Sequence, residues 1–164
     1  MTELTFPPAL ADLAAHGRFA ADFEMYEHFE AGEETAWWFR LWTGNDEVDG
    51  SEFRIFGMEG AGGYVGLWLL RPEVPLEAQP VVYLGSEGET AVLAVDLGSF
   101  LWLLAQGVGP IEATGRREAG ADDPELVTIA QRHAPASRLS PTEILERARR
   151  EFPHFESTID AMCR

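Results

Sequence analysis

Apolar and polar positions alternate between residues 21 and 70, and a period of two is the pattern of β-strands. Turn residues such as Gly44-Asn45-Asp46 and Gly60-Ala61-Gly62-Gly63 separate the runs. Two further β-prone runs, Val81–Leu84 and Ala91–Val95, flank the polar turn Gly85–Glu89, which predicts a hairpin. The pattern therefore predicts about six strands, at residues 23–29, 36–42, 53–56, 64–70, 81–84 and 91–95.

Helical signals lie near the N-terminus and after the last predicted strand. The clearest is Ser140-Pro141-Thr142-Glu143, in which a serine N-cap, a proline in the first turn and a glutamate three residues on make a capping box. Further helices are expected at residues 9–15, from Asp96 to about Gln106, and after Asp123-Pro124.

The order of these elements predicts an α+β domain. Because short connections join successive strands, we expect antiparallel pairing. The predicted architecture is a single domain over residues 1–164, with a mainly antiparallel sheet of about six strands and helices packed on one face. Its core is expected at about residues 20–106, and residues 122–164 form a C-terminal helical part.

Charge narrows the class of partner. The 28 acidic and 12 basic residues give a formal net charge of −16, which repels phosphate backbones and argues against nucleic-acid binding. The same field would attract a basic protein. The single cysteine, Cys163, allows no internal disulfide, which favours a cytoplasmic location. The longest apolar runs are far shorter than the roughly 20 residues of a membrane span.

No motif predicts a catalytic residue, a cofactor site or a metal site. Ser86 directly follows a glycine between two strands, unlike the serine of a nucleophile elbow. The loop Gly60–Gly63 lacks the lysine of a phosphate-binding loop. Asn45–Gly50 is similar to the start of a calcium loop, but the twelfth position is Phe56 rather than glutamate. None of the histidines pair at ligand spacing; they are His16, His28, His133 and His154.

The aromatic residues of 36–42 are the strongest candidate for a binding surface. As a strand, this segment would place Trp38, Arg40 and Trp42 on one face, and tryptophan and arginine are frequent anchors of protein interfaces. Glu87 and Glu89 of the hairpin would form a polar rim. The pattern leaves open whether this face is exposed or is buried by loops or a second subunit.

Residues 60–106 are similar to the SUKH superfamily, of the Smi/Knr type. The similarity rests on a glycine-containing strand entry at residues 60–70, a strand that begins Pro80-Val81-Val82, and the helix start Ser99-Phe100-Leu101-Trp102-Leu103-Leu104. This resemblance implies a binding module without catalytic residues. Many bacterial members are thought to be immunity proteins that neutralise toxins.

Three hypotheses follow. The first is a cytoplasmic, non-catalytic protein-binding module, an immunity protein that neutralises a polymorphic toxin with a basic domain. The second is a small-molecule- or metal-dependent enzyme whose site is assembled from dispersed residues such as Glu24, His28 and Arg40. The third is a structural or regulatory subunit whose aromatic residues are buried in a homodimer.

Overall fold

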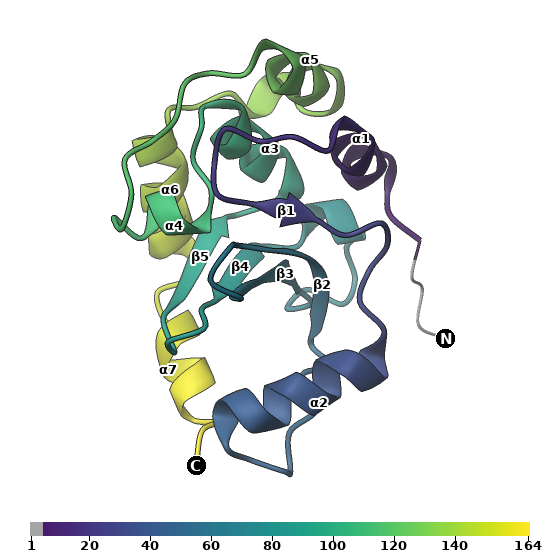
Figure 1. Cartoon of the computed structure of the whole chain (residues 1–164), viewed down its shortest axis with the longest axis vertical. Coiled ribbons are helices and arrows are strands. Elements are labelled where there is room, and N and C mark those ends of the chain that lie inside the picture. Colours follow the sequence, from purple (N-terminus) through teal and green to yellow (C-terminus); the bar gives the residue numbers. More distant parts are fainter. Residues whose placement is uncertain (1–4) are drawn as a thin grey trace.

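The computed structural model describes residues 5–164. Within this range, five strands form one antiparallel sheet (Figure 1). The strands lie side by side in chain order, and residue pairs such as Phe53 with Trp68 and Tyr64 with Leu84 set their register. The α+β class and the antiparallel pairing are therefore confirmed. The strands are β1 (Glu24–Met25), β2 (Phe53–Met58), β3 (Tyr64–Trp68), β4 (Val81–Leu84) and β5 (Thr90–Ala94).

In the part of the chain that the structure describes, seven α-helices accompany the sheet, and three of them begin where the sequence predicts. The side chains of Asp96, Asp123 and Ser140 each accept a hydrogen bond from a backbone N–H in the first turn of the helix that follows. None of the helices in the described part of the chain is long and apolar enough to cross a bilayer. The helices are α1 (Pro8–His16), α2 (Gly32–Thr43), α3 (Leu97–Ala105), α4 (Pro110–Ala113), α5 (Pro124–His133), α6 (Pro141–Glu151) and α7 (Phe155–Asp160).

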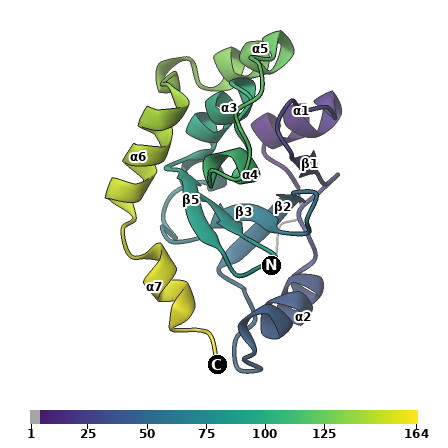
Figure 2. The same cartoon turned by 60° about the vertical axis from the view of Figure 1, so that its left-hand side comes forward.

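Helices cover both faces of the sheet, so the prediction of helices on one face is wrong. Helices α1, α3 and α5 lie over one face, whereas α2 and α7 lie over the other, and α6 runs beside the edge strand β5 and contributes to the core on both faces (Figure 2). The reason is visible in β4, whose four residues are all buried. Val81 and Tyr83 pack into the core cluster under α3, and Val82 and Leu84 pack into the cluster under α2. Apolar residues on both faces of a strand require cover on both faces.

The predicted strand at residues 36–42 is wrong, because these residues lie in α2. Its buried residues are spaced by three or four positions, as on one face of a helix. Two glutamates in the first turn and Gly44 in the left-handed conformation at the C-terminus (φ 67°) complete the signals of a helix. The buried residues of α2 are Thr35, Trp38, Phe39 and Thr43.

The predicted strand at residues 23–29 is reduced to β1, in which Glu24 and Met25 pair with Met58 and Gly57. Phe23 and Phe29 are buried in the core from irregular segments on either side of β1. Within residues 5–164, five strands therefore replace the expected six, because residues 36–42 are helical and residues 23–29 keep only the short strand β1.

The hairpin between β4 and β5 is confirmed. The N–H of Gly85 donates to the carbonyl of Glu89 at 2.7 Å, and Gly88 adopts the positive φ (90°) that closes the turn. Immediately after β5, the cap residue Asp96 starts α3, which is buried along almost its whole length. This part of the chain builds the centre of the fold, against which α2 is placed.

Candidate protein-interaction surface

The inner face of α2 is held by a buried carboxylate. Glu30 lies just before the helix, and its Oε1 accepts hydrogen bonds from the Thr35 hydroxyl (2.7 Å) and the Trp38 indole N–H (2.6 Å). The Trp38 ring also stacks on Tyr64 of β3, with 3.8 Å between the ring centroids. With only 5% of its surface exposed, Trp38 is part of the core, so for this residue burial within the chain holds of the two alternatives left open.

Burial sets the acid–base properties of this contact. Loss of solvent raises the pKa of Glu30 above its usual value of 4.5, and the two donated hydrogen bonds oppose that rise. Burial likewise raises the pKa of Tyr64, and the charge of Glu30 adds to that rise. The Glu30 carboxylate is therefore partly shielded from water. In such surroundings, the hydrogen bonds that it accepts from Thr35 and Trp38 help to hold α2 in position.

Trp42, one turn further along α2, joins the helix to the hairpin. Its indole N–H donates to the Gly85 carbonyl at 2.7 Å, and its ring is partly buried against the core cluster under α2. The structure thus brings the predicted residue Trp42 together with the predicted hairpin. Because the indole N–H of Trp42 bonds within the chain, this residue serves to position α2 against the hairpin.

The outer face of α2 carries the exposed apolar surface. Trp37 and Leu41 lie one turn apart and are 66% and 68% exposed, the largest values among the large apolar side chains of residues 5–164. Arg40 is exposed beside them, with its Nε donating to the Val48 carbonyl at 3.1 Å. These three residues, here called the α2 ridge, line a shallow hollow of about 400 Å³ together with Glu33 and Asp46.

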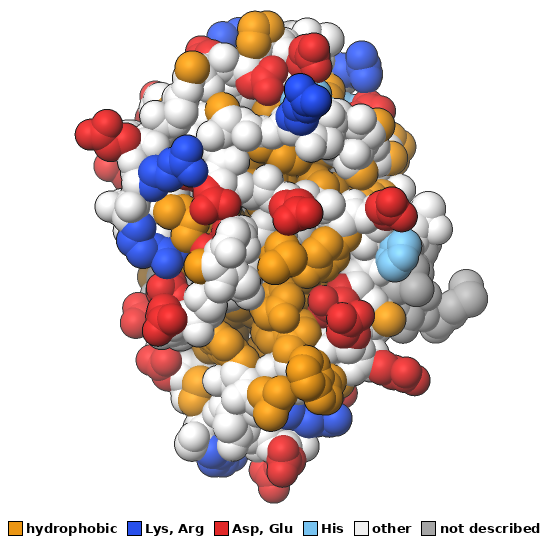
Figure 3. Space-filling model, in the orientation of Figure 1, with side chains coloured by type: hydrophobic (Ala, Val, Ile, Leu, Met, Phe, Trp, Pro, Cys, Tyr) orange, Lys and Arg blue, Asp and Glu red, His pale blue; other side chains and the backbone are white. Residues whose placement is uncertain are grey.

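An apolar area extends from α2 across one side of the molecule. Figure 3 shows hydrophobic side chains gathered in a band that runs from α2 upward across the middle of this side, with acidic side chains along its edges. An apolar centre with a charged margin is the usual composition of a protein-binding surface.

The two hairpin glutamates have different roles. Glu87 is exposed. Glu89 folds back over the turn, where it accepts the backbone N–H of Glu87 (2.8 Å) and pairs with Arg116 (3.1 Å). A Cβ at Gly85 would lie 2.0 Å from the Glu89 carboxylate, so this packing requires glycine there. Glu89 therefore stabilises the hairpin.

The residues of the enzyme hypothesis are not joined to one another. Within residues 5–164, no hydrogen bond or ion pair connects Glu24, His28 and Arg40; His28 bonds the Phe29 carbonyl and Arg40 the Val48 carbonyl. In the same part of the chain, no group of three or more histidine, cysteine, aspartate or glutamate side chains is placed to hold a metal ion.

Interpreting the segment as a strand missed Trp37, Leu41 and Glu30. The available signal was the helical spacing of Thr35, Trp38, Phe39 and Trp42, which leaves Trp37 and Leu41 on the opposite side. Glu30 carries no such signal, because its burial depends on contacts made only in the folded chain.

Comparisons of the chain with protein-family models, with curated proteins and with solved structures find no match. The resemblance of residues 60–106 to the SUKH superfamily therefore stays a prediction.

Proposed function

We propose that this protein is a cytoplasmic, non-catalytic binding module that neutralises a basic toxin domain, and that the α2 ridge is its contact surface. The observation that carries the proposal is the exposure of Trp37 and Leu41 on a helix whose other face is fully used by the core. The resemblance of residues 60–106 to the SUKH superfamily, many of whose bacterial members are thought to be immunity proteins, supplies the class of partner.

The composition of the ridge supports binding to protein. Single exposed apolar residues are common, but an adjacent tryptophan, leucine and arginine combine the side chains that contribute most to interfaces. Tryptophan gives a large rigid contact area, and Arg40 can donate further hydrogen bonds through its guanidinium. Because the hydrogen bonds of Trp38 and Trp42 hold the inner face of α2 to the rest of the fold, the α2 ridge loses little conformational entropy when a partner binds.

The charge of the molecule supports a basic partner. The net charge of −16 gives a long-range attraction for a cationic domain, and Glu33 and Asp46 border the ridge itself. Association with such a partner should slow steeply as salt rises from about 50 to 500 mM, because screening shortens the electrostatic range.

The test is capture followed by neutralisation. Wild-type protein serves as bait in an extract of the source organism, beside the double variant Trp37→Ala/Leu41→Ala. The matched control is Leu70→Ala/Val74→Ala, which removes the two other large apolar side chains of residues 5–164 that are exposed. We expect a captured basic protein to be lost only from the ridge variant, and its toxicity in cells to be suppressed by co-expressed wild type and by the control.

Two outcomes would contradict the proposal. The first is equal capture by the ridge variant and the control. The second is concentration-dependent dimerisation of the wild type in sedimentation that the ridge variant abolishes, which would assign the ridge to a homodimer.

A further inference from the structure

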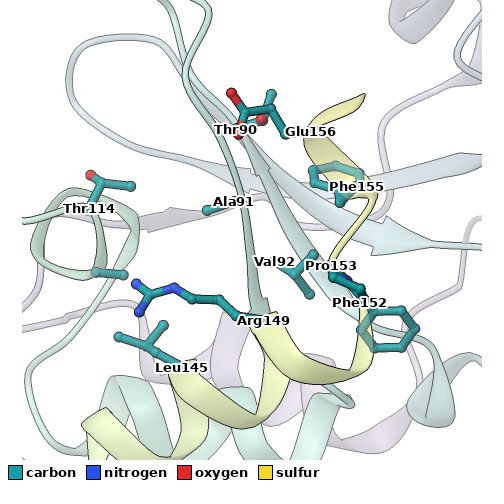
Figure 4. Close-up of a pocket in the computed structure, with 11 residues that line it drawn as sticks. Thr90, Ala91, Val92, Thr114, Leu145, Arg149, Phe152, Pro153, Phe155 and Glu156 are labelled. Atoms are coloured by element: carbon teal, nitrogen blue, oxygen red, sulfur yellow. The ribbon is translucent and has the colours of Figure 1, made fainter. Parts of the chain in front are cut away.

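A second cavity lies on a different part of the molecule, beside the edge strand β5. It has a volume of about 490 Å³ and is bordered by β5, α4, α6 and the start of α7 (Figure 4). None of its lining residues belongs to the α2 ridge. Its apolar wall consists of Ala91, Val92, Leu145, Phe152 and Phe155. This size and this largely apolar lining are typical of a ligand site.

The backbone of β5 faces this cavity with unused hydrogen-bonding groups. Gly85 and Glu89 form a bonded pair of the hairpin ladder, so the register places Ala91 in the next bonded pair. Thr90 and Val92, which alternate with it, direct their N–H and C=O groups away from β4. Within residues 5–164, no hydrogen bond outside the β-ladder reaches these groups. An open strand edge is a template for a further strand.

The open part of this edge is short and closed at one end, since Thr90 and Ala91 are partly exposed whereas Val92 is 6% exposed. Past Val92, β5 continues into Leu93 and Ala94, which are fully buried, and α6 contacts this strand. A strand added beside Thr90–Val92 cannot continue past α6 along the edge. The closed end therefore favours a chain terminus over the middle of a longer segment.

An arginine lies at the closed end. Figure 4 shows the Arg149 side chain extending from α6 into the cavity between Leu145 and Ala91, while Glu156 lies at the Thr90 end. Within the described chain, no carboxylate forms an ion pair with Arg149, which is exposed, as are the equally unpaired Arg147 and Arg150 that lie outside the cavity lining. A guanidinium matches the two oxygens of a carboxylate, so the terminus it fits is a carboxyl terminus.

We propose that this cavity binds the carboxyl-terminal residues of an extended peptide, which adds as a strand to β5 and places its terminal carboxylate on Arg149. The backbone groups of Thr90 and Val92 supply the main-chain hydrogen bonds, and the apolar wall receives side chains of the peptide. The site is separate from the α2 ridge, and the proposal holds whether or not the ridge binds a toxin.

The alternative role of Arg149 is structural, in which its aliphatic stem covers apolar surface and its charge stays in water. The test separates the two roles with a defined probe, the peptide acetyl-Gly-Val-Thr-Val-Val with a free carboxyl terminus. The amide resonances of the ¹⁵N-labelled protein are followed during titration to about 10 mM peptide, a range that detects weak binding.

We expect saturable shifts at the amides of Thr90 and Val92. Converting the peptide carboxylate to an amide should weaken binding about tenfold, the size expected for a charge-assisted hydrogen bond. Arg149→Gln should weaken binding of the free-acid peptide by the same factor and leave binding of the amide peptide unchanged. Arg150→Gln, the matched control on the neighbouring exposed arginine, should change neither. Methylation of the peptide nitrogens should abolish binding, because strand addition needs them.

Three results would overturn the inference. They are the absence of saturable shifts at Thr90 and Val92, equal affinity for the free acid and the amide, and equal affinity of Arg149→Gln and wild type for the free acid. The amide peptide tests the carboxylate contact without any change to the protein. If the wild-type protein binds the peptide as expected but the ridge experiment fails, the peptide site is supported and only the proposed function is contradicted.

Discussion

Helices α2 and α3 are both rich in aromatic and aliphatic residues, but they use them differently. Every residue of α3 except Gly98 is buried, because the helix packs against the sheet and contacts both α5 and α6. In α2, one face is buried, and Trp37 and Leu41 on the other are more than 60% exposed. Aromatic and aliphatic residues therefore contribute to the core where other elements cover a helix on all sides, as in α3. Where one side of the helix is uncovered, as in α2, the same residue types remain exposed.

The two helices should therefore respond differently to substitution. Loss of an apolar side chain from α3 leaves a cavity that the surrounding elements cannot close. Loss of one from the outer face of α2 removes surface that water already reaches, so the folded state loses little.

The largest effect is expected at Trp102 in the centre of α3. Its ring is fully buried, and its indole N–H donates to the Ala134 carbonyl at 2.8 Å. Trp102→Ala should lower the free energy of unfolding by about 3–5 kcal/mol, the usual range for a large aromatic residue in a core. Denaturant unfolding measures it. A loss below about 1 kcal/mol would mean that α3 is not the packed centre of the fold.

A smaller effect is expected at Trp38 on the inner face of α2. Trp38→Phe keeps a ring against Tyr64 but removes the N–H that Glu30 accepts. Because the buried Glu30 carboxylate then loses one of its two hydrogen bonds, the free energy of unfolding should fall by about 1–3 kcal/mol. The matched control, Trp37→Phe on the outer face, should change it by less than about 0.5 kcal/mol. Equal losses in the two variants would contradict the division of α2 into an inner and an outer face.

The pH dependence of stability should also come from the inner face. Because the pKa of Glu30 is raised in the folded state, the folded protein holds its proton more tightly than the unfolded chain does. This contribution stabilises the protein below the unfolded value of 4.5 and is lost as pH rises through the folded pKa.

Glu30→Gln removes this titration and keeps an oxygen for Thr35 and Trp38. The variant should therefore gain stability relative to wild type as pH rises from about 4 to 7. Thermal unfolding across this range measures the difference. A difference between Glu30→Gln and wild type that shrinks with rising pH would contradict the account.

Much of the fold could be predicted because its signals are local. The hairpin at Gly85–Glu89, the cap Asp96 and the cap Ser140 each depend on a few neighbouring residues, and the structure confirms all three. Residues 36–42 were harder, since their apolar positions fit both a period of two and a period near 3.6. Aromatic residues favour strands, but the glutamates before them and Gly44 after them stabilise a helix.

The predicted binding residues lie in different surroundings in the structure. Arg40 and Glu87 are exposed, whereas Trp38 is buried and Glu89 pairs with Arg116. A period of two placed Trp38, Arg40 and Trp42 on one face, but in the helix Trp38 faces the core and Arg40 faces solvent. The partner of Glu89 lies 27 positions away in the sequence, and no local pattern indicates such a contact.

The most direct test of the central claim measures folding and binding in the same variant. Trp37→Ala/Leu41→Ala should change the free energy of unfolding by no more than about 1 kcal/mol, since both side chains are already largely hydrated. It should weaken the affinity for the captured partner by at least about 30-fold, as expected for an interface anchor. Unchanged affinity in the folded variant, or a loss of stability as large as that of Trp102→Ala, would contradict the account.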